Sequence, residues 1–229
     1  MKVAVHWGGG KDSCFALHKA VERGFEVNHL LTYAYQEPYI FHSFKLMELQ
    51  SQALGIPQQK VKIKDPMRDV YNALATLKQE GIEGIVTGDI ANVNHKPFYE
   101  SACKQIGLEL FTPLWDPTGN HANLLNEELS AGIKFIFGCI DTTYARDLEN
   151  FAKKWLGHLC DNECQKELLA VCAKNKLDPC GETPTAWYHT MVIDAPLFKQ
   201  KIEAVKFDLK KKGKNRYVDV KHAVLKPKF

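Results

Sequence analysis

Long apolar runs are absent from this sequence of 229 residues. No stretch approaches the roughly 18 apolar residues that a membrane-spanning helix needs, so no membrane partner is expected. A basic segment followed by an apolar one is also missing ahead of the first strand candidate, Lys2–Trp7, which argues against a secretory signal. We therefore expect a cytoplasmic protein.

A strong excess of one charge is missing too, because the formal net charge is only +3. The main basic cluster is Lys210–Arg216, which we interpret as a solvated turn between two strands. Contact with an acidic partner such as RNA is the alternative. No RNA-binding module is recognisable, so nucleic acid is not an expected partner. A homo-oligomer stays open.

Tight C-x-x-C pairs, the mark of strong metal motifs, are absent as well. The seven cysteines are an odd number in a chain that is not small, so we expect reduced thiols. Cys160 and Cys164 lie one helical turn apart, and with Cys172 and Cys180 they could hold zinc or an iron–sulfur cluster. We favour unligated cysteines and leave the metal unknown.

The first half of the chain alternates between short apolar segments and segments with apolar residues at helical spacing. Strands are predicted at Lys2–Trp7, Val27–Tyr33, Lys60–Ile63, Ile85–Thr87 and Glu109–Thr112. Helices are predicted at Ser13–Arg23, Phe44–Leu54, Met67–Glu80 and Pro97–Ile106. This alternation predicts an α/β fold with a doubly wound parallel sheet. Ligands of such sheets bind beyond the carboxyl ends of the strands, so loops 8–13 and 88–96 should face one crevice.

The pattern changes after residues 115–117, where strands and helices no longer alternate regularly. Helices are predicted at His121–Ala131, Tyr144–Trp155 and Asp161–Lys174. Strands are predicted at Ile133–Cys139, Met191–Asp194, Ile202–Leu209 and Tyr217–Val224. We therefore expect two domains, residues 1–118 and a smaller α+β domain at 119–229.

A glycine-rich loop lies between the first predicted strand and the first predicted helix. Its residues are Gly8, Gly9, Gly10, Lys11, Asp12 and Ser13. Glycines let backbone amides approach an anion, and the helix adds the positive end of its dipole. Lys11 supplies a point charge and Ser13 a hydroxyl donor, so a phosphate-binding pocket is predicted. Neither the Walker spacing nor the G-x-G-x-x-G fingerprint is present.

The loop resembles the SGGxDS motif of the PP-loop ATP pyrophosphatases, with Gly8 in place of the usual serine. The resemblance implies a HUP-like fold (adenine nucleotide alpha hydrolase-like) for residues 1–118. It implies ATP cleavage between the α- and β-phosphates, with Mg²⁺ at the departing pyrophosphate. The whole loop would then bind ATP, and Lys11 would also be catalytic.

Three further segments, Gly107–Trp115, Cys180–Thr190 and Asp194–Phe198, resemble the diphthine–ammonia ligase family or a bacterial relative of it. The resemblance implies a ligase that adenylates a carboxylate, releases pyrophosphate and forms an amide with ammonia. That family amidates diphthine on elongation factor 2, so the acceptor could be a modified residue on a translation factor. Here the segment 181–190 is longer than the family pattern, and Trp187 stands where a second glutamate is usual.

Other polar residues complete the predicted site. Glu182 and His189 are the catalytic candidates on the acceptor side, where a carboxylate orients ammonium and a histidine of near-neutral pKa moves a proton. Asp89 follows a buried strand and is a candidate contact to ribose or magnesium, and His95 and Lys96 could reach phosphates. Two other functions remain open: an RNA-thiolating PP-loop enzyme with a catalytic cysteine, and a nucleotide-binding protein without turnover.

Overall fold

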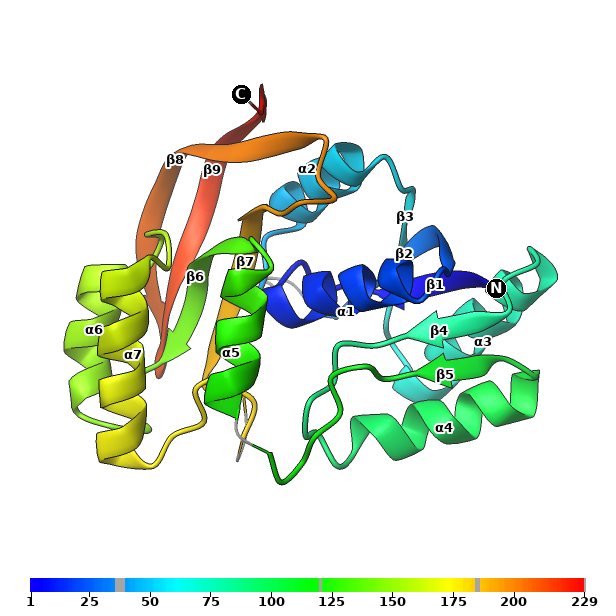
Figure 1. The fold of residues 1–229 in the computed structure, drawn as a ribbon, viewed down its shortest axis with the longest axis horizontal. Helices are drawn as coiled ribbons and strands as arrows, with labels where there is room; N and C mark the ends of the chain where they lie inside the picture. The colour runs from blue at the N-terminus through cyan, green and yellow to red at the C-terminus, as the bar shows by residue number, and fades with distance from the viewer. Residues whose placement is uncertain (36–39, 120, 184–185, 229) are drawn as a thin grey trace. The chain divides into compact units, whose positions relative to one another are not determined.

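The computed structural model describes residues 1–35, 40–119, 121–183 and 186–228. Within these ranges the chain forms two compact units, each made of several segments (Figure 1). The first unit contains residues 1–8, 12–35 and 55–117. The second contains residues 9–11, 40–54 and 118–228. None of the helices in the described ranges is long and apolar enough to cross a membrane.

The first unit is built on a five-stranded parallel sheet of order β3-β2-β1-β4-β5. Its strands are β1 (Lys2–His6), β2 (Glu26–Ala34), β3 (Gln58–Lys62), β4 (Gly84–Val86) and β5 (Glu109–Phe111). The chain moves outward from β1 to β3 and then crosses back to β4. The strand order therefore reverses between β1 and β4, which is the point where open α/β sheets bind ligands.

Helices cover both faces of this sheet, as right-handed crossovers require. They are α1 (Lys11–Glu22), α3 (Pro66–Gln79) and α4 (His95–Ile106). The buried side chains of α3 and α4 join those of β1, β2 and β4 in one apolar core cluster. Local signals fix the ends of these helices: Asp65 accepts a hydrogen bond from the amide of Arg68 at the start of α3, and Gly107 ends α4 with φ +78°.

The second unit contains a four-stranded antiparallel sheet of order β7-β6-β9-β8. Its strands are β6 (Lys134–Asp141), β7 (Tyr188–Asp194), β8 (Gln200–Lys212) and β9 (Asn215–Pro227). Its helices are α2 (Phe44–Leu54), α5 (His121–Ser130), α6 (Asp147–Trp155) and α7 (Asn162–Asn175). Helix α2 contacts β7, β8 and β9, and α6 contacts β6 and α7.

The structure confirms the predicted class, a doubly wound parallel α/β sheet with a separate α+β part that contains an antiparallel sheet. That second part is not the smaller one, because residues 9–11 and 40–54 belong to it as well. The predicted basic turn is much shorter than expected. Lys210–Lys212 belong to β8 and Arg216 to β9, so the turn is reduced to Gly213 and Lys214. Lys210 of β8 forms an ion pair with Asp219 of β9. This pair offsets part of the positive charge that favoured a solvated turn here.

Candidate functional site

The glycine loop at the end of β1 is held in shape from β7 and α2. Gly9 has φ +73°, a conformation that favours glycine. Its carbonyl accepts hydrogen bonds from the amide of Val192 (2.9 Å) and from Nε2 of Gln50 (2.9 Å). Gln50 also donates to the carbonyl of Val192 (2.8 Å). Residues 9–11 of the loop are therefore fixed within the second unit.

Lys11 is the most constrained residue of the loop. Its amide donates to Oγ1 of Thr190 (3.0 Å), and its Nζ lies 3.1 Å from Oε2 of Glu128. Both charged side chains are fully buried. Its Nζ also lies 5.9 Å from the centre of the Tyr188 ring. The predicted phosphate-binding lysine thus forms a buried ion pair with Glu128 on α5. Removing only one of the two charges of such a pair strongly destabilises the folded protein.

The remaining loop residues lie at the start of α1 in the first unit. A Cβ added to Gly88 would lie 2.7 Å from the backbone carbon of Asp12 and 2.7 Å from the amide of Ser13. The loops that follow β1 and β4 therefore touch, as the sheet topology predicts. Only glycine at position 88 permits this approach. Asp12 stands in the first turn of α1, where the helix dipole favours a negative charge.

His189 lies on β7, close to two aromatic rings that are distant from it in the sequence. Its ring centre is 4.7 Å from that of Phe41 and 5.1 Å from that of His42. Burial lowers the pKa of His189 to about 3, and the nearby His42 acts in the same direction. The predicted near-neutral pKa is therefore wrong. At neutral pH the imidazole is uncharged and offers hydrogen bonds instead of a readily transferred proton.

Protonation of His189 should destabilise the fold in acid. Because its folded-state pKa is depressed, its stabilising contribution is complete above pH 6.5 and is lost as the pH falls toward 3. We expect urea titrations to give a free energy of unfolding roughly 1–3 kcal/mol lower at pH 4.5 than at pH 7, after allowance for partial exposure. His189→Gln should reduce that difference, whereas His158→Gln, at an exposed position, should not. Equal pH dependence of the unfolding free energy in both variants would contradict the lowered pKa of His189.

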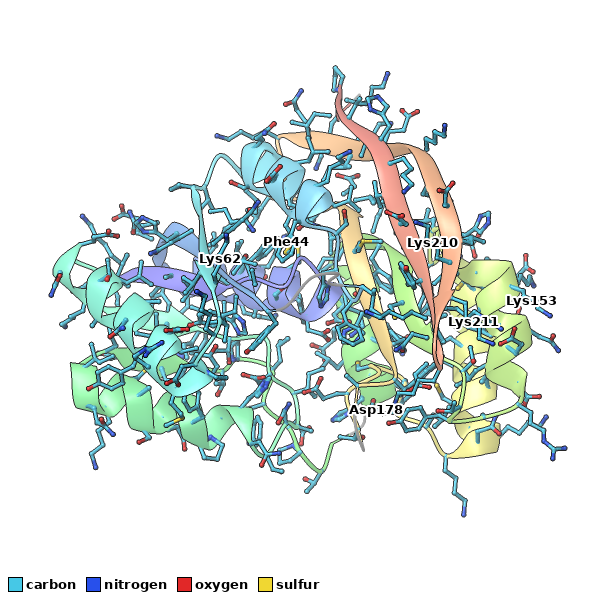
Figure 2. All side chains as sticks on the ribbon, turned by 180° about the vertical axis from the view of Figure 1, so that it is seen from behind. Phe44, Lys62, Lys153, Asp178, Lys210 and Lys211 are labelled. Carbon is cyan, nitrogen blue, oxygen red and sulfur yellow. The ribbon has the colours of Figure 1, made fainter. Side chains whose placement is uncertain are left out.

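Glu182 belongs to a loop that is organised by the carboxylate of Asp178. The side chain of Asp178 is labelled in Figure 2. Asp178 accepts hydrogen bonds from the amides of Cys180 (2.8 Å), Glu182 (3.2 Å) and Thr183 (3.0 Å). Its Oδ2 also lies 2.8 Å from Nδ1 of His121 at the start of α5. The backbone at Glu182 is thereby fixed. Pro184 and Thr185, in the segment that departs from the family pattern, lie outside the described residues.

Trp187, at the position where a second glutamate was expected, is a core residue. It is fully buried, and its indole Nε1 donates to the carbonyl of Asp178 (2.9 Å). The cysteines are core residues too, since all seven are buried free thiols. A hydrogen bond with Cys160 and burial raise the pKa of Cys164 well above its ordinary value. The thiol of Cys164 is therefore in its unreactive, protonated form.

Asp89 and His95, from the loop after β4, contact each other. Nδ1 of His95 lies 3.2 Å from Oδ1 of Asp89. Asp89 is buried, whereas the His95 side chain is 54% exposed. Lys96 lies 3.5 Å from Glu100 and stacks over Trp115, with its Nζ 4.7 Å from the ring centre. The contact of these residues with a nucleotide stays a prediction.

Several residues that shape the site were missed from the sequence. They are Gln50, Glu128, Asp178, Thr190 and His121. One signal was available: Gln50 stands on the apolar face of α2, alongside Leu46, Met47, Ala53 and Leu54. A polar residue in such a stripe needs a buried partner, which here is the glycine loop.

The strand order, the loop after β1 and its contact with the loop after β4 define an α/β protein of the PP-loop class. Comparison with known families agrees with this architecture. A model of the diphthamide synthase N-terminal domain matches residues 1–110, and one of the C-terminal domain matches residues 135–226. The chain belongs to the diphthamide synthase family.

Relatives named diphthine–ammonia ligase extend the match across both units. The Schizosaccharomyces pombe protein is 28% identical over 88% of this chain, and the chain spans only 36% of that protein's length. The Rattus norvegicus protein is 27% identical over 88% of this chain and 82% of its own. A crystal structure of a predicted subunit of a tRNA methyltransferase from Methanocaldococcus jannaschii superposes with a TM-score of 0.45. It is 16% identical and covers 86% of this chain and 98% of that one.

Proposed function

We propose that this protein is an ATP-dependent ligase that adenylates a carboxylate, releases pyrophosphate and forms an amide with ammonia. Family membership and the relatives named diphthine–ammonia ligase support this proposal. The observation that carries it is the glycine loop, which ends β1, begins α1 and lies where the strand order reverses. Backbone amides at such a helix start bind phosphate groups.

In the proposed mechanism the loop binds the triphosphate of ATP. Gly8, Gly9 and Gly10 allow close backbone approach, and Ser13 adds a hydroxyl donor. Lys11 stabilises charge on the departing pyrophosphate, while Glu128 fixes the position of its ammonium group. The hard carboxylate oxygens of Asp12 suit Mg²⁺, which neutralises phosphate charge when bound.

The acceptor side is assigned to Glu182 and His189. Asp178 fixes the backbone at Glu182, so the carboxylate of Glu182 can be presented in a constant position. The neutral imidazole of His189 can accept or donate a hydrogen bond to the acyl group. The acceptor is a carboxylate, for which the names of the relatives suggest diphthine, a modified residue on a translation factor. An RNA-thiolating function is less favoured, since it needs an accessible thiol and all seven cysteines are buried.

The products formed from ATP test this proposal directly. With a diphthine-bearing translation factor and ammonium chloride, we expect equal amounts of AMP, pyrophosphate and amide. A sample without ammonium should form little amide, because ammonia is the nucleophile. Formation of ADP would indicate a different phosphotransfer reaction. Tight ATP binding with no products would indicate a nucleotide-binding protein without turnover.

A further inference from the structure

A hollow lies on the surface of the second unit, between the last turn of α6 and the hairpin formed by β8 and β9. Its volume is about 190 Å³. Three of its lining residues are aliphatic, Ala152, Leu156 and Leu209, and the other described ones are basic. Ala152 and Leu156 are buried, whereas Leu209 is 54% exposed. The hollow therefore combines an apolar surface with positive charge.

Two contacts hold α6 against the hairpin and so fix the walls of the hollow. Arg216 of β9 donates from Nη2 (2.6 Å) and from Nε (3.2 Å) to Oε1 of Glu149 on α6. The chain just after α6 also packs on the hairpin. A Cβ added to Gly157 would lie 2.7 Å from Cε2 of Phe207 and 3.4 Å from Cγ2 of Val218. The hollow is therefore built into the fold.

The basic side chains at the hollow are only partly neutralised. Lys210 forms its ion pair with Asp219, and successive side chains of a strand point to opposite faces, so Lys211 points to the other face of β8. Lys153 of α6 and Lys211 are both exposed, and both are labelled in Figure 2. Neither forms an ion pair with a residue in the described ranges. An anionic partner is therefore favoured.

A purely structural role explains only one of these residues. Lys153 lies in the last turn of α6, where a cation interacts favourably with the helix dipole. That role does not account for Lys211, which lies on a strand. It also does not explain why Leu209 is exposed beside two buried aliphatic residues, an arrangement typical of interaction sites.

The size and the lining of the hollow restrict the ligand. Pockets for whole small molecules usually hold about 300–1,000 Å³, so a nucleotide does not fit. An apolar cavity of about 150 Å³ accommodates benzene, so this hollow fits one leucine-sized side chain. Single-stranded nucleic acids usually stack their bases on aromatic rings, and no described lining residue is aromatic. An apolar side chain flanked by carboxylates fits both the apolar surface and the charge.

We propose that this hollow docks an acidic segment of the protein substrate. One apolar side chain of that segment contacts Leu209 and Leu156, and its flanking carboxylates pair with Lys153 and Lys211. The proposal rests on the proposed function, in which a protein carries the acceptor carboxylate. Glu182 and His189, the residues assigned to the acceptor, belong to the same unit.

A short peptide tests the docking site without turnover. The probe is a fluorescein-labelled peptide with one leucine between two pairs of glutamates, and fluorescence anisotropy measures its Kd for the full chain. Lys153→Glu with Lys211→Glu should raise the Kd at least about tenfold, because attraction becomes repulsion. The matched control is Lys166→Glu with Lys201→Glu, which also reverses one exposed lysine on a helix and one on β8. The control should change the Kd less than about twofold.

The apolar contact has its own test. Leu209→Ser should raise the Kd of the peptide roughly three- to tenfold, the loss expected for one partly buried leucine. A peptide with serine in place of leucine should bind the wild-type protein equally weakly. It should lose little further affinity for Leu209→Ser, because the two changes remove the same contact. Independent, multiplicative losses would overturn the placement of the peptide leucine at Leu209.

Other occupants of the hollow give different results. Tighter binding of an oligouridylate of equal charge, lost in the double lysine variant, would replace the acidic peptide with nucleic acid. Self-association of the wild-type protein that Leu209→Ser abolishes, with no peptide bound, would assign the hollow to a second copy of the chain. Either result would overturn the proposal.

Kinetics separate this proposal from the proposed function. With a diphthine-bearing translation factor, the double lysine variant should raise the KM for the factor about three- to tenfold. Its kcat and its KM for ATP should change less than about twofold, because docking is remote from the reacting atoms. An unchanged KM for the factor, with normal AMP release, would overturn the docking site alone. Peptide binding without any AMP release by the wild-type protein would refute the proposed function alone.

Discussion

Replacing Lys11 with methionine should greatly reduce turnover and also destabilise the protein. The substitution leaves the Glu128 carboxylate buried without its cation, which typically costs about 3–5 kcal/mol. Loss of the positive charge near the departing pyrophosphate should lower the rate of AMP release by roughly 100-fold or more. Urea unfolding and AMP release measure the two effects.

A paired substitution separates structure from catalysis. In Lys11→Met with Glu128→Leu, both buried charges are gone and apolar groups of similar size replace them, so stability should recover. Turnover should stay low if Lys11 acts on the phosphates. Recovery of AMP release in the double variant would mean that Lys11 serves only to neutralise Glu128.

Replacing Gly9 with alanine should have the second largest effect. A Cβ at this position would lie 2.6 Å from Oε1 of Gln50 and 2.8 Å from Cγ of Met47, and the backbone has φ +73°. The left-handed conformation alone costs alanine roughly 1–2 kcal/mol. Overlap with α2 should add about 1–3 kcal/mol. Displacement of the loop should reduce AMP release at least about tenfold.

Gly24→Ala is the matched control for this experiment. Gly24 has a similar conformation, φ +81°, but a Cβ there would meet nothing within 4 Å. Its cost in unfolding free energy should therefore be the conformational term alone, with AMP release unchanged. Equal destabilisation of both variants would show that the contact of Gly9 with Gln50 and Met47 is not restrictive.

The parallel sheet was predictable because its signals are local. Apolar runs, helical spacing and terminal glycines mark β1 to β5 and α1 to α4 within a few residues of their observed bounds. The Asp65 cap and the Gly107 terminus were also readable from the sequence. The glycine loop was predicted because its composition and its place between β1 and α1 coincide.

The partners of that loop were not predictable, because they come from distant parts of the chain. Gln50, Glu128 and Thr190 lie 41, 117 and 179 residues from the loop residues that they contact, as the differences 50−9, 128−11 and 190−11 give. No local pattern encodes such pairings. The pKa of His189 was missed for the same reason, since burial and His42 determine it.

The interleaving of the two units along the chain has a consequence for protein engineering. A fragment ending at residue 118 would retain α2 yet discard β7, β8 and β9, against which that helix packs. The apolar stripe of Leu46, Met47 and Leu54 would then face solvent and promote aggregation. Exchange of halves between relatives should therefore transplant residues 9–11 and 40–54 together with the C-terminal part, as one discontinuous module.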